Sequence, residues 1–178
     1  MKKGSKQGPA PACKKQGFTV LEMIMVILII GILTVIISSN ITGLYPAKLS
    51  GAAERLASDI RYAQSLALSK HLQHKVVFEV SAERYAVYCF SGSWELVADP
   101  LNTGNSLVVD YTTDSRWQGI KIDATNLLSD TIEFDSTLGI PMGIPDAEPQ
   151  GEILLNYGNT SRKVSITKNT GRVSIPSP

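Results

Sequence analysis

Hydrophobic and polar residues follow three successive patterns along this chain of 178 residues. Residues 18–37, FTVLEMIMVILIIGILTVII, are apolar on every face of a helix and hold one charge. Between residues 47 and 70 apolar residues recur every three or four positions, and short alternating runs follow from residue 75. These periods predict a wholly apolar helix, an amphipathic helix and a set of β-strands, in that order.

The first segment, residues 18–37, is long enough to cross a membrane. A helix of its 20 residues rises about 30 Å, the thickness of the hydrocarbon core of a bilayer. A helix packed on a soluble core would show one apolar stripe, whereas this segment is apolar all round. We therefore expect a transmembrane helix that can also serve in assembly.

The second segment predicts an amphipathic helix within residues 38–74 that continues the first. Its apolar stripe consists of Leu49, Ala52 or Ala53, Leu56, Ile60, Ala63 and Ala67. Its charged residues fall largely on other faces: Glu54, Arg55, Asp59 and Arg61. Because proline removes a backbone donor and glycine loosens the chain, Gly43 and Pro46 predict a kink or a melted turn between the two helical parts.

Residues 75–178 predict an antiparallel β domain that packs on the amphipathic helix, an α+β arrangement. Eight β-rich runs lie in this region: KVVFEV, RYAVYCF, SLVVDY, GIKI, TIEF, EILLNY, RKVSIT and RVSI. Turn residues separate these runs, as between neighbouring antiparallel strands. Residues 136–151 hold three glycines and three prolines, which excludes a central strand and predicts a surface loop.

Charge divides the chain at residue 17. The first 17 residues hold five lysines and no acid, so the rest has 12 Lys and Arg against 16 Asp and Glu, a net charge of −4. This acidic body argues against phosphate binding by its whole surface. By the positive-inside rule, the lysines place the N-terminus in the cytoplasm and the residues beyond 37 on the other side of the membrane.

Glu22 distinguishes between two interpretations of the apolar helix: a secretory signal that is cut away, and a helix that stays on the mature protein. An ordinary secretory signal ends in a small-residue cut site, and the sequence SSN at residues 38–40 is a poor version of one. A carboxylate inside a membrane helix costs about 2.5 to 3.5 kcal/mol unless something compensates it. A cut between Gly17 and Phe18 would create an α-ammonium one helical turn from Glu22, and such an ammonium on a neighbouring subunit could pair with it.

The sequence KKQGFTVLE at residues 14–22, followed by the apolar run, resembles the class III signal of type IV pilins and pseudopilins. It combines a basic leader, a glycine before the cut, a phenylalanine after it and a glutamate at the fifth mature position. The resemblance implies that a prepilin peptidase and N-methyltransferase cuts after Gly17 and methylates Phe18. It also implies a single-pass protein of the bacterial inner membrane, with a periplasmic globular domain, that assembles with other pilin or pseudopilin subunits through its helix and Glu22.

The body resembles one branch of this family, the H-type minor pseudopilin of type II secretion and its FimT-like relatives in type IV pili. Three segments carry this resemblance: the alanine-rich residues 52–68, residues 134–141, and the closing sequence TGRV at residues 170–173. It implies a pilin-like α+β fold in four parts: a cleaved leader (1–17), an assembly helix (18–37), its amphipathic continuation (38–74) and a β-rich domain (75–178).

DNA binding is the alternative function, because FimT-like relatives in competence pili are associated with a basic C-terminal Gly-Arg-x-Arg motif. Residues 171–174 read GRVS here, so the second arginine is absent. Four basic residues still lie near the C-terminus: Arg162, Lys163, Lys168 and Arg172. Alternating basic residues on a terminal hairpin are more often a solvated sheet face, so we keep DNA capture as the second hypothesis.

Catalytic and metal-binding patterns are weak in this sequence. His71 and His74 lie three residues apart without a third ligand, so we interpret both as solvated residues at a helix end. Cys89 lies in an alternating run and is expected to be a small buried strand residue. The sequence therefore predicts a structural subunit, without enzyme activity or cofactor, of a type II secretion pseudopilus or type IV pilus. A single-pass enzyme or sensor is the third hypothesis.

Overall fold

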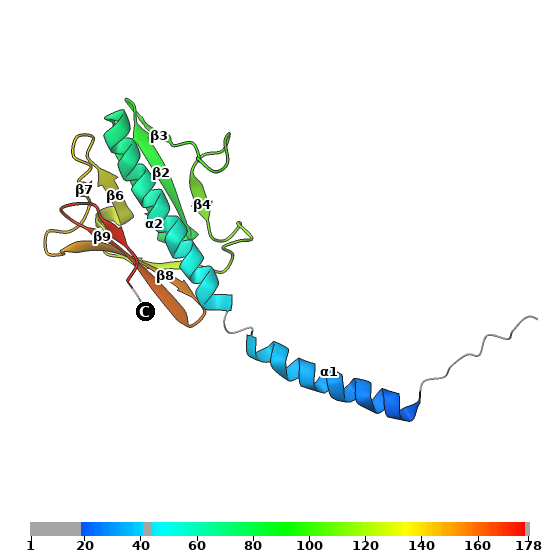
Figure 1. Cartoon of the computed structure of the whole chain (residues 1–178). Helices are drawn as coiled ribbons and strands as arrows, with labels where there is room; N and C mark the ends of the chain where they lie inside the picture. Colours follow the sequence, from blue (N-terminus) through cyan, green and yellow to red (C-terminus); the bar gives the residue numbers. More distant parts are fainter. Residues whose placement is uncertain (1–18, 41–43, 177–178) are drawn as a thin grey trace, which may run out of the picture. The chain divides into compact units, whose positions relative to one another are not determined.

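The chain divides into two compact units, Met1–Ile41 and Thr42–Pro178 (Figure 1). The computed structural model describes residues 19–40 and 44–176, and within these ranges it describes no side chain of residues 35–40, 44 or 45. The first unit holds the helix α1 (Val20–Asn40). The second unit holds the helix α2 (Leu44–Lys70) and the β-strands. The helical sequence expected between residues 18 and 74 thus forms two separate helices.

α1 is apolar over its described side chains, because Glu22 is the one charged residue between residues 20 and 34. Its large hydrophobic side chains are exposed on all faces, from 45% for Val26 to 77% for Val20. Within residues 19–40 and 44–176, no helix combines the length and the hydrophobicity needed to span a membrane. Of the span expected at residues 18–37, Phe18 and the side chains of residues 35–37 lie outside the described part.

α2 buries the apolar stripe that its spacing predicts. Nine of its hydrophobic residues are buried: Leu49, Ala52, Ala53, Leu56, Ala57, Ile60, Ala63, Leu66 and Ala67. Pro46, expected at a break in the helix, lies instead in the first turn of α2. A backbone N–H in the first turn has no intrahelical acceptor, so proline sacrifices no hydrogen bond there. Gly43, the other expected breaker, lies outside the described residues.

The strands form two antiparallel sheets. The first sheet has the order β3-β2-β1-β6-β7, and β4 pairs with the first half of β2. Its strands are β1 (His74–Glu79), β2 (Arg84–Phe90), β3 (Trp94–Leu96), β4 (Val108–Asp110), β6 (Thr131–Phe134) and β7 (Pro141–Met142). The second sheet, β10-β9-β8-β5, consists of β5 (Lys121–Thr125), β8 (Gln150–Tyr157), β9 (Thr160–Thr167) and β10 (Val173–Ser174). Two short 3-10 helices, η2 (Val80–Ala82) and η3 (Leu128–Asp130), join strands.

Each of the eight predicted β-rich runs contains a strand, but two further strands were not predicted. β3 is three residues long, too short for its alternation to stand out. β7 lies within residues 136–151, where we expected a surface loop. It pairs with β6 alone and so forms an edge of the first sheet, the position in which a sheet tolerates proline.

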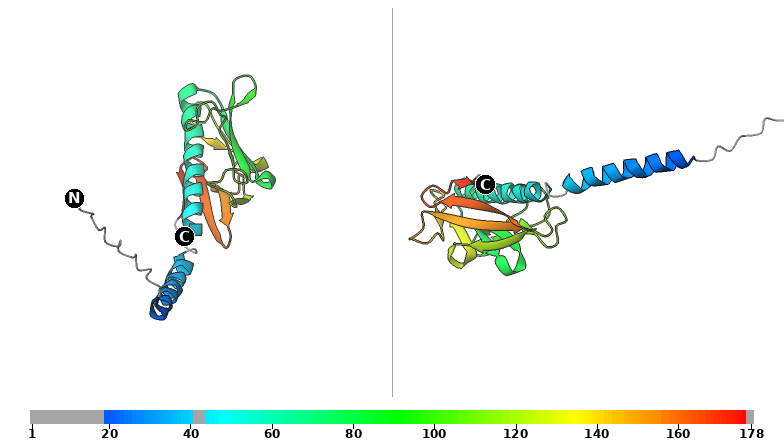
Figure 2. Two further views of the ribbon diagram at one scale, coloured as in Figure 1. Left: turned by 90° about the vertical axis from the view of Figure 1, so that its right-hand side faces the viewer. Right: turned by 90° about the horizontal axis from the view of Figure 1, so that it is seen from below.

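α2 packs along both sheets of the second unit (Figures 1 and 2). It contacts β1 and β6 of the first sheet and β8, β9 and β10 of the second. The buried face of α2 and the inward side chains of both sheets form one hydrophobic core. Alanine at many of the buried helix positions allows strands to approach the helix closely. The predicted α+β fold, a helix packed on antiparallel β-structure, is confirmed.

Candidate functional site

The start of α1 carries the residues that the sequence assigns to assembly. Gly17 and Phe18 lie outside the described residues, whereas Glu22 lies in the first turn of α1. The backbone N–H of Glu22 donates a hydrogen bond to Thr19 Oγ1, at 3.2 Å. Thr19 therefore caps α1, because an N-cap hydroxyl satisfies an amide of the first turn that has no intrahelical acceptor.

Thr19 is a site residue that the sequence reasoning missed. The signal was present, since Thr-x-x-Glu before an apolar run is the capping-box pattern. Glu22 occupies the acidic position of that pattern, and the partial positive charge at a helix start favours a carboxylate there. Glu22 is therefore compatible with the start of α1 in a single chain, before any pairing with another subunit.

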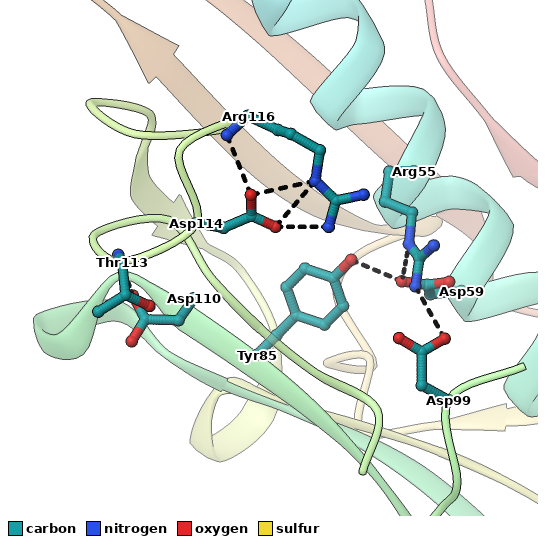
Figure 3. A network of polar contacts seen from close by, with 8 residues as sticks. All are labelled: Arg55, Asp59, Tyr85, Asp99, Asp110, Thr113, Asp114 and Arg116. Carbon is teal, nitrogen blue, oxygen red and sulfur yellow. Dashed lines mark hydrogen bonds and ion pairs between the residues drawn. The ribbon is translucent and has the colours of Figure 1, made fainter. Parts of the chain in front are cut away.

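A polar cluster centred on the buried Asp59 and Tyr85, which we call the α2 clamp, joins α2 to β2 and to the loop after β3 (Figure 3). It consists of Arg55, Asp59, Tyr85 and Asp99. The Asp59 side chain accepts hydrogen bonds at Oδ2 from Arg55 Nε and from the Tyr85 hydroxyl, both at 2.8 Å. The Nη2 atom of the Arg55 guanidinium lies 3.6 Å from Asp99 Oδ1. The clamp thus links three segments that are far apart in the sequence.

Asp59 corrects the expectation that the charged residues of α2 avoid its buried face, because Asp59 is 4% exposed. Burial raises the pKa of its carboxyl, and the hydrogen bonds from Tyr85 and Arg55 together with the charge of Arg55 oppose that rise. Burial also raises the pKa of Tyr85 well above its usual value, so the hydroxyl remains a donor. A buried acid held by two donors in this way is a structural element of the core.

His71 and His74 do not form a common site. His71 is exposed and ends α2 with a φ of 52°, whereas His74 begins β1 and is fully buried. The interpretation of His74 as a solvated residue is wrong, because α2 ends four residues earlier and His74 lies in a strand with a fully buried side chain. Its Nδ1 lies 2.8 Å from the carbonyl oxygen of Leu72, and its Nε2 is buried without a hydrogen-bond partner. Burial lowers the pKa of His74.

The part of the chain that the structure describes holds no metal-binding cluster of three or more side chains, and its cysteine Cys89 lies on a strand. Across residues 19–40 and 44–176, no three His, Cys, Asp or Glu side chains are grouped so that they could hold a metal ion. Cys89 lies on β2 as a partly buried residue against the core, close to the buried strand residue that we expected.

The four basic residues of the DNA hypothesis do not gather on one surface. Arg162 and Lys163 are neighbours in β9, so their side chains point to opposite faces of the sheet. Lys163 pairs with Glu152 and Lys168 pairs with Asp146, each at 2.8 Å. Two of the four charges are thus balanced by acids of the same chain, which weakens this group as a phosphate-binding surface.

Comparisons with known proteins match the N-terminal motif and the fold. Residues 13–38 match the family described as the prokaryotic N-terminal methylation motif. Curated proteins gave no match to the sequence. Two structures of the minor pseudopilin EpsH from the type 2 secretion system of Vibrio cholerae each match with a TM-score of 0.54. They are 11% and 10% identical, cover 74% of this chain, and are themselves covered to 98% and 95%.

The type IV minor pilin FimU of Pseudomonas aeruginosa also matches, at 18% identity and a TM-score of 0.47, over 74% of this chain and 90% of FimU. The motif match includes the predicted cut site and Glu22, and the EpsH match gives the fold of the globular unit. The chain therefore joins an N-terminal methylation motif to a globular unit with the fold of EpsH.

Proposed function

We propose that this protein is a minor pseudopilin, a non-enzymatic structural subunit of a type II secretion pseudopilus or a type IV pilus. The observation that carries the proposal is the joining of the methylation motif at residues 13–38 to a globular unit with the EpsH fold. The chain enters the inner membrane with its N-terminus in the cytoplasm. A prepilin peptidase cuts after Gly17, Phe18 is N-methylated, and the globular unit remains in the periplasm.

The surface of α1 supports a role in assembly. Its large hydrophobic side chains are exposed all round the helix, so the helix can pack against several neighbours at once. Burial of one such side chain away from water contributes about 1.5 to 3 kcal/mol, and within lipid close packing supplies the cohesion. A fibre core made of such helices would satisfy every face of α1.

Glu22 sets the register of that packing in our proposal. Cleavage before Phe18 creates an α-ammonium four residues before Glu22, which is about one helical turn. Pairing of this carboxylate with the ammonium of a neighbouring subunit offsets the cost of placing a charge among apolar helices. Thr19 keeps the first turn of α1 closed next to the new N-terminus, because it caps the amide of Glu22.

The mature N-terminus tests this function. Mass spectrometry of the protein from its host membrane should find N-methylated Phe18 as the first residue. Gly17→Val should retain the leader and stay out of fibres. The matched control is Gly31→Val within α1, where an added side chain meets open space in the isolated chain, and it should still be cleaved. A different mature N-terminus, or normal assembly of Gly17→Val, would favour a simple membrane anchor instead.

A further inference from the structure

His74 and Cys89 are neighbours across the first sheet, at the end of the globular unit where α2 ends and β3 lies (Figure 1). His74 in β1 is the direct cross-strand partner of Cys89 in β2. The N–H of Phe90 donates to the carbonyl oxygen of Gln73, at 2.9 Å, so His74 and Cys89 form a pair without backbone hydrogen bonds between them. In such pairs the Cα atoms lie about 4.5 Å apart and the side chains approach most closely. The imidazole and the thiol therefore lie side by side on one face of the sheet.

This face of the sheet is the buried one. His74, Val76 and Phe78 alternate along β1 as its buried residues. On its other side, His74 is paired with Phe134 of β6, which is also fully buried. Phenylalanine offers neither a lone pair nor a polar hydrogen. Of the two side chains that the sheet places directly beside His74, only that of Cys89 can bind an ion.

The imidazole of His74 has the hydrogen bonding of a metal ligand. Its Nδ1 lies 2.8 Å from the carbonyl oxygen of Leu72, an arrangement in which Nδ1 carries the proton and Nε2 keeps a lone pair. Histidines that bind metals commonly donate their other ring N–H to a backbone carbonyl in this way. Nε2 is buried without a hydrogen-bond partner among the described residues, although buried polar atoms are rarely left unsatisfied. The unsatisfied lone pair indicates that a ligand belongs at Nε2.

Cys89 supplies a second ligand and an entrance to the site. It is a free cysteine that packs against the core and is partly exposed. Its other cross-strand neighbour is the exposed Glu95 in β3, an edge strand of the sheet. An ion can therefore reach the thiol from the sheet edge, whereas the imidazole next to it is fully buried.

The number and the chemistry of the ligands select the ion. Across residues 19–40 and 44–176, no third His, Cys, Asp or Glu side chain joins these two in a metal-binding group. Zn²⁺ in a structural site takes about four ligands, whereas Cu(I) is stable with a pair of ligands and is favoured by soft thiolates. A thiolate and Cu(I) together carry no net charge, which suits a buried position. Burial lowers the pKa of His74 and the charge of Lys70 adds to this effect, so the site also disfavours a divalent ion.

We propose that His74 Nε2 and Cys89 Sγ form a binding site for a soft monovalent metal ion of the Cu(I) class. On binding, the thiol releases its proton to solvent and forms a metal–sulfur bond, Nε2 donates its lone pair, and the oxidation state of the metal does not change. The ion then links β1 to β2 just beyond the end of α2. The inference goes beyond the proposed function and does not depend on it.

An anaerobic titration with Cu(I), in competition with a chromophoric Cu(I) chelator, tests the site. The protein is the full-length chain in detergent with Cys13→Ser, which leaves Cys89 as its one thiol. This parent should bind a single Cu(I). X-ray absorption of the complex should show copper bound to one sulfur and to an imidazole nitrogen. Because this measurement changes neither ligand, it tests the site even where a variant fails to fold.

Cys89→Ser and His74→Gln each remove one ligand. Each should bind Cu(I) at least about 100-fold more weakly, since loss of a ligand's hydrogen-bond partner alone costs about 10- to 100-fold. Bound Cu(I) should raise the midpoint of thermal unfolding of the parent, because it binds the folded chain, and should not raise that of the variants.

Two controls separate the site from an isolated thiol or histidine. Ser58→Cys, combined with Cys89→Ser, moves the thiol to the exposed face of α2, and it should bind Cu(I) no more tightly than His74→Gln does. His71→Asn replaces an exposed histidine with a φ of 52°, which asparagine accepts, and it should keep the affinity of the parent.

Four results would overturn the inference. These are a parent that binds no Cu(I), copper bound through sulfur alone, equal affinities of the parent and the Ser58→Cys protein, and tighter binding of Zn²⁺ than of Cu(I). A folded His74→Gln protein with the affinity of the parent would likewise refute the role of the imidazole. Each of these results leaves the proposed function untouched, because cleavage after Gly17 and entry into fibres are measured separately.

Discussion

Tyr85→Phe measures how firmly the α2 clamp attaches helix α2 to the sheet. The substitution removes one hydroxyl, which is buried and donates to Asp59 Oδ2 at 2.8 Å. Hydrogen bonds to charged groups contribute about 1.5 to 3 kcal/mol, and a buried carboxylate that loses a donor bears the full desolvation cost. Arg55 remains to satisfy Asp59 in part. We therefore expect the free energy of unfolding to fall by about 2 kcal/mol.

Tyr88→Phe is the matched control, because it makes the same change three residues along β2. Tyr88 is only partly buried, and its ring lies 5.7 Å from the ammonium of Lys75. Loss of its hydroxyl should change stability by less than about 0.5 kcal/mol. Glu79→Ala is a second control, since it breaks an ion pair whose side chains are 45% and 38% exposed, and it should cost at most about 1 kcal/mol.

Urea unfolding of the globular unit, followed by circular dichroism, provides the measurement. The midpoint should fall for Tyr85→Phe while the slope with denaturant stays the same. Asp59→Asn should be destabilising too, and the double variant should lose less than the sum of the two single losses, because the residues share one hydrogen bond. Equal stabilities of Tyr85→Phe and Tyr88→Phe would refute the view that the clamp stabilises the fold.

Three further predictions address assembly, pH and backbone strain. Glu22→Ala should still be inserted and cleaved but reach fibres poorly on immunoblots of sheared filaments; normal incorporation would remove the pairing argument. Burial lowers the pKa of His74, so as the pH falls the unfolded chain binds a proton before the folded chain does. The stability that is present above about pH 6.5 should therefore be lost as the pH falls. His74→Leu should flatten this dependence in urea titrations between pH 7 and 5. Gly143→Ala should lower the free energy of unfolding by at least about 3 kcal/mol, because its φ is 95° and the new Cβ would collide with a backbone carbonyl of β6. Gly92→Ala is the control, since its φ is 103° but the new Cβ meets open space. It should show the backbone strain alone, about 1 kcal/mol in thermal unfolding.

The periodicity of the sequence predicted the main elements because each of them has one face that must be buried. Leu49, Leu56 and Ile60 recur at helical spacing and are fully buried in α2. β2 and β6 begin and end at the residues that their alternating runs predict. β3 and β7 were not predicted, because strands of three and two residues are too short to show a period. At β7, Pro141 also argued against a strand.

The sequence suggested candidate site residues only where the signal is local. Glu22 and the cut site form a compact motif, and Thr19 could have been recognised from the same four residues. The burial of Asp59 was not predictable, because its partner Tyr85 is 26 positions away in the sequence and meets it only in the folded core. The acid partners of Lys163 and Lys168 are likewise distant along the chain, so the basic group looked more strongly charged in the sequence than it is in the structure.

In the proposed fibre, where the N-terminal helix would hold the subunit, the packing of α2 along both sheets has a mechanical consequence. A pull on the globular unit enters at the start of α2 and runs along its 27 residues. Contacts with strands of both sheets share that force along the helix, and the Arg55–Asp59–Tyr85 hydrogen bonds anchor its middle. The helix cannot peel away one turn at a time from a single surface. A growing or retracting fibre could therefore transmit tension through this subunit without unfolding it.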